Sequence, residues 1–351
     1  MSNRSAITAA VLACVAVFAV AAVSMRAQSP ASPAKSASAK APAVGTKAGN
    51  SPRLPWGDPD LQGTWFVLYD VPLERSAANA GKEFLTDAEV KAADEKKGIN
   101  PGRNARSSNT EQDVSGAYNA VFNSVLKTGK RTSMIIDPPD GKIPPIVPGS
   151  PAAKFGQGFR LGLGTDPGVN DNPETIPQSP RCLGVPMPFL PLNTLFAQGT
   201  VMQVVQSPKS LGIYMEDDHA GGGNRVIFMD GRPHAPARAK FFLGDSRGHW
   251  EGNTLVVETT NFLQGFRGSN PDTYKMVEHF TRVDAHTLRR DITFIDPKTW
   301  TKPWTVTIQM GRAPDGKHMI FDSACHEGNV GIIGILYGNR KQEQEQSQKK
   351  K

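Results

Sequence analysis

The chain has 351 residues, of which 38% are hydrophobic and 21% charged, the composition of a folded protein. Its formal net charge of +7 comes from the two ends of the chain. Residues 1–53 hold six basic and no acidic residues, and residues 339–351 hold five basic and two acidic residues. Residues 54–338 hold 29 basic and 31 acidic groups, a net charge of −2. This part lacks the positive field that phosphate binding needs, which argues against a nucleic-acid partner.

The first residues have the pattern of an export signal. Arg4 precedes an apolar run from Ala6 to Val23, and small residues that suit cleavage after Ser24 or Ala27 follow. We predict a signal peptide over residues 1–27, and therefore a periplasmic or extracellular protein with no stable membrane span after cleavage. Two alternatives remain. The run is long enough for a retained membrane anchor, and the four residues ending at Cys14 resemble a lipoprotein box.

Two cysteines, Cys182 and Cys325, remain once the signal is removed. In an exported compartment two such thiols are more often paired than free, so we predict a disulfide between them. It would close a loop of about 143 residues and stabilise the fold by about 4–5 kcal/mol in the chain-entropy model. The alternative makes Cys325 a nucleophile beside His326 and Glu327. Adjacent side chains of a strand point to opposite faces, which disfavours such a catalytic arrangement.

The composition along the chain predicts a single β-rich domain over residues 54–338. Residues 28–53 are rich in Pro, Ala, Ser and Lys, and residues 339–351 are almost entirely polar. Neither segment has enough apolar surface to offset the entropy of ordering, so we expect a disordered linker and a disordered tail.

The first half of the predicted domain contains a strand, a helical cap and a long loop. A strand is expected over Gly63–Tyr69. A capping box at Thr86–Glu89 opens a helix of about ten residues, and we place a small helical insertion at about 84–126. Residues 144–192 are rich in proline and lack periodicity, which predicts a long loop over the surface of the domain.

From Val201 onward, short strands alternate with tight turns. The expected strands are Met202–Val205, Gly212–Met215, Val226–Met229, Ala239–Leu243, Thr254–Thr259, Tyr274–Val283, Thr287–Ile295, Thr305–Met310 and His318–Ser323. This spacing predicts an antiparallel barrel or sandwich. The motif Gly63-Thr64-Trp65 resembles the Gly-x-Trp opening of lipocalin-like barrels. We therefore favour a mainly β, barrel-like fold of the lipocalin or calycin type.

The hairpin formed by Tyr274–Val283 and Thr287–Ile295 can be interpreted residue by residue. If Val283 lies opposite Leu288, one face holds Val277, Val283, Leu288, Ile292 and Phe294 together with His279, Thr281 and Arg290. The other face then holds Glu278, Phe280, Arg282, Arg289, Asp291 and Thr293 and is exposed to solvent. Polar groups on the apolar face need partners. A lined cavity in a barrel, or a buried hydrogen-bonded pair in a sandwich, would supply them.

Four long motifs stand out, at Arg131–Pro144, Gly244–Phe262, Asp296–Trp304 and Ala324–Asn329. Together they resemble a largely uncharacterised family of exported proteins that soil bacteria often carry in many copies. The resemblance covers about residues 54–338 and implies export but no established reaction. Members commonly have Arg where this chain has His279, so the resemblance implies no shared role for this histidine.

Three histidines are candidate catalytic residues. His219 lies in a polar, glycine-rich segment, and His234 follows fifteen residues later. One of them could act as a general base, or both could bind a divalent metal with a carboxylate. The alternative is a solvated loop, because no tight metal-binding spacing is present. His326 would lie beside a pocket mouth if the disulfide holds it near the proline-rich loop. The candidate substrate-binding residues are His279, Arg290, Trp250 and Trp304.

These features favour an exported protein that binds a small apolar or aromatic molecule in an apolar pocket. It would use a histidine for hydrolysis, hydration or elimination, and no cofactor is expected. The alternatives are a non-catalytic, envelope-associated binding module and a metal-dependent hydrolase.

Overall fold

The computed structural model describes residues 52–99, 126–153, 170–176, 180–183, 187, 190–191, 201–215, 222–313, 320 and 325–349. The chain divides into two units, Met1–Gly45 and Thr46–Lys351, and all described residues belong to the second. The predicted signal peptide and nearly all of the predicted linker lie outside the described residues.

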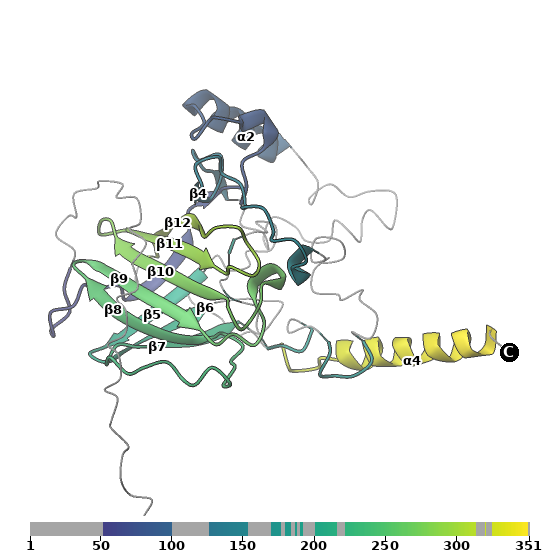
Figure 1. Ribbon diagram of the computed structural model, residues 1–351. Coiled ribbons are helices and arrows are strands. Elements are labelled where there is room, and N and C mark those ends of the chain that lie inside the picture. The colour runs from purple at the N-terminus through teal and green to yellow at the C-terminus, as the bar shows by residue number, and fades with distance from the viewer. Residues whose placement is uncertain are drawn as a thin grey trace, which may run out of the picture. The chain divides into compact units, whose positions relative to one another are not determined.

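Within the part of the chain that the structure describes, nine strands close into a barrel (Figure 1). They are β1 (Gly63–Val67), β5 (Val201–Ser207), β6 (Ser210–Met215), β7 (Gly223–Phe228), β8 (Asp245–Glu251), β9 (Thr254–Thr260), β10 (Lys275–Arg282), β11 (Thr287–Ile295) and β12 (Trp304–Arg312). Neighbouring strands are antiparallel except β7 and β8, which are parallel, and the pairing of β1 with β12 closes the ring. The predicted mainly β, barrel-like fold is confirmed.

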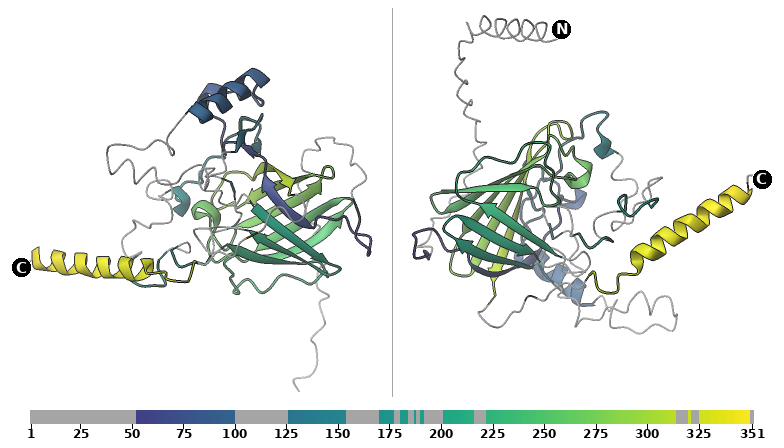
Figure 2. Two further views of the ribbon diagram at one scale, coloured as in Figure 1. Left: turned by 180° about the vertical axis from the view of Figure 1, so that it is seen from behind. Right: turned by 90° about the horizontal axis from the view of Figure 1, so that it is seen from below.

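Several smaller elements lie outside this ring. Strand β4 (Ile135–Asp137) pairs with β12, and β2 (Tyr69–Asp70) pairs in parallel with β3 (Lys127–Thr128). Two short 3₁₀ helices, η1 (Ala77–Asn79) and η3 (Phe266–Gly268), lie in connections. The remaining elements are the helices α2 (Asp87–Ile99) and α4 (Gly331–Lys349), and Figure 2 shows all of them from two further sides.

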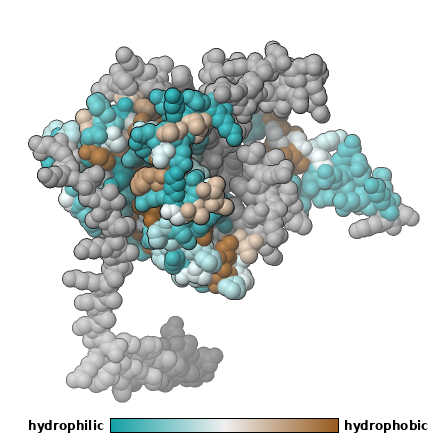
Figure 3. Space-filling view, turned by 90° about the horizontal axis from the view of Figure 1, so that it is seen from above, coloured by the Kyte–Doolittle hydropathy of each residue, from teal (hydrophilic) through white to brown (hydrophobic). Residues whose placement is uncertain are grey.

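Alternation of side chains along the strands separates the inside of the barrel from its outside. In β5, Met202 and Val204 are buried, while their neighbour Val205 is 57% exposed. In β7, Ile227 is buried and Val226 is 54% exposed. Because successive side chains of a strand point to opposite faces, each strand gives one row to the core. On the face seen in Figure 3, hydrophilic residues alternate with separate apolar spots.

The β10–β11 hairpin pairs one residue away from the register expected from the sequence. Arg282, not Val283, lies opposite Leu288. The rows of β11 are as predicted, but those of β10 are exchanged. Glu278, Phe280 and Arg282 are buried with Met276, whereas Val277, His279 and Thr281 face outward. The observed register buries the larger side chains Met276 and Phe280, and it brings Glu278 and Arg282 to partners inside the molecule.

Residues 53–62 lie across the barrel end at which β1 starts, which we call the capped end. Arg53 Nη2 donates a hydrogen bond of 2.8 Å to Asn253 Oδ1 in the β8–β9 turn. The Leu61 backbone N–H donates a bond of 2.6 Å to Gln206 Oε1 of β5. These contacts tie the segment to strands on different sides of the ring.

The tryptophan of the Gly-x-Trp motif is part of this closure. Trp65 is fully buried, and its Nε1 donates to the Leu61 carbonyl at 2.9 Å. The guanidinium of Arg282 lies 5.6 Å from the centroid of the Trp65 ring and donates through Nη1 to the Asp60 carbonyl at 2.7 Å. A buried cation is thereby stacked on an aromatic ring and bonded to the segment that covers it.

The capping box predicted at the start of α2 is present. Glu89 N–H donates to Thr86 Oγ1 at 3.3 Å, and Thr86 N–H donates to Glu89 Oε2 at 2.8 Å. Two backbone groups at the start of the helix are therefore satisfied by the same two residues.

The C-terminal segment differs from the disordered tail expected over residues 339–351. Helix α4 runs through it to Lys349, although none of its residues is buried. Its second half consists largely of Glu, Gln, Lys and Arg, residues with high helix propensity, and Arg340 pairs with Glu343 at 3.2 Å. Local preference favours this helix, and Asn339 and Arg340 also bond to Asp171. Within the described ranges, no helix is both long and apolar enough to cross a membrane.

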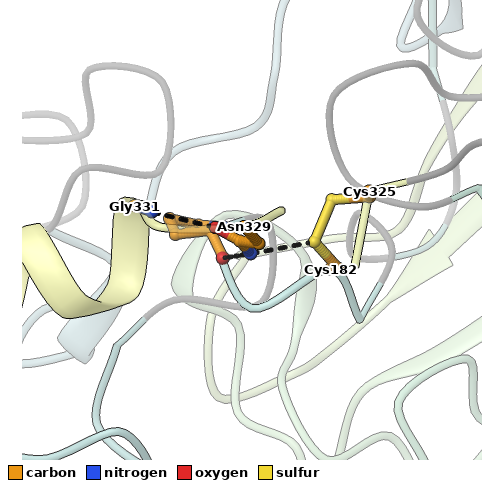
Figure 4. The surroundings of a disulfide bond; sticks show 5 residues. Cys182, Cys325, Asn329 and Gly331 are labelled. Atoms are coloured by element: carbon orange, nitrogen blue, oxygen red, sulfur yellow. Dashed lines mark hydrogen bonds between the residues drawn. A yellow bond between two sulfur atoms is a disulfide. The ribbon is translucent and has the colours of Figure 1, made fainter. Parts of the chain in front are cut away.

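Cys182 and Cys325 form a disulfide, with Cα atoms 5.6 Å apart (Figure 4). The predicted bond is confirmed, which excludes Cys325 as a free nucleophile in this state. Asn329 holds the same corner together, because its Nδ2 donates to Cys182 Sγ at 3.1 Å and to the Pro180 carbonyl at 3.0 Å. The disulfide joins the proline-rich segment, whose Met187 and Leu190 belong to the hydrophobic core, to the start of the C-terminal region.

Removal of the disulfide should lower stability substantially. A double variant, Cys182→Ser with Cys325→Ser, is expected to lose about 4–5 kcal/mol of unfolding free energy, because the bond closes a long loop in the unfolded chain. Urea unfolding of the oxidised protein and of the variant measures the difference. A reducing agent should destabilise the native chain to the level of the variant and leave the variant unchanged. Equal stability of the oxidised and reduced native chain would contradict the expectation.

Candidate functional site

A charged cluster lies inside the barrel and draws on five neighbouring strands. Arg225 of β7, Glu278 of β10 and Arg290 of β11 are its charged members, with exposures of 4%, 0% and 2%. Ser246 of β8 and Thr259 of β9 lie between them and are also buried. The two-residue alternation of each strand points all five side chains inward. We call these five residues the interior cluster.

Glu278 bridges the two arginines. Its Oε2 lies 2.5 Å from Arg225 Nη2, and its Oε1 accepts from Arg290 Nη2 at 2.7 Å and from Arg290 Nε at 2.9 Å. Arg225 also donates through Nε to Ser246 Oγ at 2.9 Å and through Nη2 to Thr259 Oγ1 at 2.6 Å. The ion pairs thus run across the barrel from β7 to β11.

The interior cluster carries a net charge of +1. Burial opposes ionisation of Glu278, but the charges of Arg225 and Arg290 outweigh it and hold the pKa of this carboxyl below its usual value. Glu278 is therefore ionised at neutral pH, and guanidinium groups keep their proton. Two positive charges and one negative charge are enclosed together.

Several buried donor groups have no hydrogen-bond partner among the described residues. They are Arg225 Nη1, the Tyr274 hydroxyl, Trp250 Nε1 and Trp304 Nε1. Burial raises the pKa of Tyr274 well above its usual value, as does the charge of Glu278, so the hydroxyl keeps its proton. Leaving a buried donor unsatisfied costs about 1–3 kcal/mol, and folded proteins seldom do so.

An aromatic group fills the barrel end opposite the capped end, which we call the aromatic end. Trp304 stacks on Phe294 with ring centroids 4.0 Å apart, and Trp300 meets Trp304 edge-on at 5.5 Å. Tyr274 packs against Phe262 at 4.8 Å. Strand β12 starts and β11 finishes here, so the aromatic rings lie above one end of the interior.

The four predicted substrate-binding residues do not lie on one face. Arg290 belongs to the interior cluster and Trp304 to the aromatic end, while Trp250 packs against the hydrophobic core. His279 faces outward from β10, where it lies opposite Asp291 of β11. Three of the four are thus brought to the inside of the barrel.

The predicted catalytic histidines are placed on separate elements. His234 lies in the connection between β7 and β8, and His326 is an exposed residue of the turn that precedes α4. His219 lies outside the described residues. The contacts of His234 among the described residues are with Asp245 and Glu258, on strands β8 and β9.

His234 is held by carboxylates rather than by a nucleophile. Its Nδ1 lies 3.0 Å from Asp245 Oδ2, and its Nε2 lies 3.5 Å from Glu258 Oε1. Asp245 also accepts from Ala235 N–H at 2.8 Å and from Arg247 Nη1 at 2.6 Å. Burial raises the pKa of Asp245, but these hydrogen bonds outweigh it and keep the pKa below its usual value. The arrangement anchors the long β7–β8 connection against the barrel wall.

The described residues contain no group of three or more His, Cys, Asp or Glu side chains arranged to hold a metal ion. Of the two histidines considered as metal ligands, His234 contacts the carboxylates of Asp245 and Glu258. The other, His219, lies outside the described residues.

The interior cluster was largely missed by reasoning from the sequence. Arg225, Glu278 and Tyr274 were not candidates, and Glu278 was assigned to the solvent face. One signal was available. A single-residue shift of the β10 register places Glu278 and Arg290 on the same face, where each supplies the charge that the other needs.

Loss of the bridging carboxylate should destabilise the barrel. Glu278→Gln is expected to cost about 3–5 kcal/mol, because it leaves two buried guanidinium groups without their counter-charge. Glu258→Gln is the matched control. Glu258 lies on the outer side of β9 and pairs with Lys275 at 3.0 Å, so its loss should cost less than about 1 kcal/mol. Urea unfolding of both variants at neutral pH measures the difference, and equal costs would refute the bridging role.

The contribution of Glu278 should also depend on pH. Because its pKa is lower in the folded than in the unfolded chain, its stabilisation is complete above the unfolded pKa of about 4.3 and is lost as the pH falls through the folded pKa. The stability difference between the native chain and Glu278→Gln should be constant from neutral pH down to about pH 5 and shrink below that. A difference that persists unchanged to pH 3 would contradict this.

Comparisons with known proteins do not assign this chain to a family. No family model matches the chain, and no curated protein matches it. Among solved structures, the chain shows similarity to a mutant of the fluorescent protein UnaG, with 8% identity and a TM-score of 0.22 over 33% of this chain and 72% of that chain. The barrel described above rests on its own strand pairing.

Proposed function

We propose that this protein binds a small apolar or aromatic molecule inside its barrel. The observation that carries the proposal is the set of buried donors without a partner among the described residues, at Arg225, Tyr274, Trp250 and Trp304. A core built only for stability pairs such groups or replaces them with apolar ones. A bound molecule would supply the missing acceptors, as is usual in apolar sites with a few placed polar groups.

The surrounding side chains support an apolar ligand. The rings of the aromatic end lie next to the interior. Met202 of β5 and Met215 of β6 are buried in the same hydrophobic core. Aromatic and methionine side chains adapt their contacts to flat or irregular apolar molecules.

We further propose that the protein is exported and belongs to the family of exported proteins that its four long motifs resemble. The disulfide supports an oxidising compartment, since such bonds form and persist outside the reducing cytosol. A binding role needs no catalytic group, which agrees with the separate positions of His234 and His326.

Binding of a neutral apolar fluorophore tests the proposal. N-phenyl-naphthylamine should bind the full chain saturably, at one molecule per chain, with enhanced fluorescence. Ile213→Phe adds volume on the inner face of β6 and should weaken binding at least about threefold. Val226→Phe adds the same ring on the exposed face of β7 and should leave the affinity unchanged.

Circular dichroism and thermal unfolding show that both variants are native. Absence of saturable binding, or equal weakening by the inner and outer substitutions, would overturn interior binding.

A further inference from the structure

Most of the buried side-chain groups without a hydrogen-bond partner among the described residues are donors, and the one carboxylate oxygen among them, Glu278 Oε2, lies 2.5 Å from Arg225 Nη2. Arg225 Nη1 and the indole nitrogens of Trp250 and Trp304 can only donate hydrogen bonds, and the protonated Tyr274 hydroxyl can donate one. The carboxylate of Glu278 is already shared between two guanidinium groups. The interior therefore offers donors and needs acceptors.

The charge balance points the same way. Arg225 and Arg290 together carry two positive charges against the single negative charge of Glu278. Arg225 Nη2 and Nε are occupied by Glu278, Thr259 and Ser246, whereas Nη1 has no partner among the described residues. A buried guanidinium nitrogen without an acceptor is costly, and an anion beside Arg225 Nη1 would remove that cost.

Tyr274 lies in the same part of the interior. It immediately precedes β10, lies four residues before Glu278 and is buried, and its pKa responds to burial and to the charges of Glu278, Asp296 and Arg225. Its ring also packs between Phe262 and Trp300 of the aromatic end. The residue thus connects the charged middle of the barrel to the aromatic surface.

We infer that the ligand is an organic anion, with a carboxylate or similar singly charged oxyanion held by Arg225 Nη1 and Tyr274, and with an apolar or aromatic frame lying against the aromatic end. This inference rests on the proposed function and specifies the chemical class of the ligand. An oxyanion accepts charge-assisted hydrogen bonds from a guanidinium and a hydroxyl together, which matches the two groups that lack partners.

Two probes that differ in a single group test the inference. Anilinonaphthalene sulfonate has the same ring frame as N-phenyl-naphthylamine and one added sulfonate. The native full chain should bind the sulfonate at least about tenfold more tightly than the neutral probe, as expected for a charge-assisted bond to a buried guanidinium. Fluorescence titration of both probes under the same conditions measures the ratio.

Arg225→Met should abolish this preference. It removes the charge and keeps the volume, so affinity for the sulfonate should fall about tenfold or more, while affinity for the neutral probe changes less than about threefold. Arg289→Met is the matched control. Arg289 lies beside Arg290 on the outer face of β11, where it pairs with Asp291, so its loss changes the net charge equally without touching the interior.

Tyr274→Phe provides a second variant if Arg225→Met does not fold. It removes one hydroxyl that has no partner among the described residues, and it should weaken sulfonate binding at least about threefold while sparing the neutral probe.

The outcomes separate the two proposals. Binding of the neutral probe with no preference for the sulfonate would overturn the anion assignment and leave interior binding intact. A preference that Arg289→Met removes as fully as Arg225→Met would also overturn it, because surface charge would then be its cause. Binding of neither probe would overturn the proposed function and the anion with it.

Discussion

The structure depends on how three charges are enclosed in a barrel. Glu278 can be buried only because Arg225 and Arg290 approach its two oxygens from opposite sides, and each arginine can be buried only because of Glu278. These side chains come from β7, β10 and β11, so the ion pairs form only when the sheet has curled and closed. Charge pairing and closure of the ring therefore require each other.

The two ends of the barrel are closed by different kinds of contact. At the capped end, residues 53–62 are bonded to β5 and to the β8–β9 turn, and Arg282 is stacked over Trp65 beneath them. The aromatic end is closed by rings, which offer apolar surface and few hydrogen bonds. The interior is therefore bounded by hydrogen bonds at one end and by aromatic rings at the other.

Features governed by local rules could be predicted from the sequence, and those governed by long-range pairing could not. The capping box at Thr86 and Glu89, the strand spacing after Val201 and the Cys182–Cys325 bond follow from nearby residues or from the small number of cysteines. The register of β10 could not be predicted in this way. Alternation of side chains fits a strand with Glu278 inside as well as a strand with His279 inside. The choice depends on Arg225, which is 53 residues earlier in the chain and whose partner no local pattern identifies.

The described histidines do not gather inside the barrel as the sequence led us to expect. Both ring nitrogens of His234 lie near carboxylates, those of Asp245 and Glu258. His279 faces outward, because its neighbours Glu278 and Phe280 take the inward-facing positions of β10. Other elements instead bring the guanidinium of Arg225, the hydroxyl of Tyr274 and the indole of Trp304 to the inside of the barrel, and these groups hold their protons at neutral pH. These polar groups inside the barrel are therefore permanent hydrogen-bond donors, unlike the titratable histidines expected from the sequence.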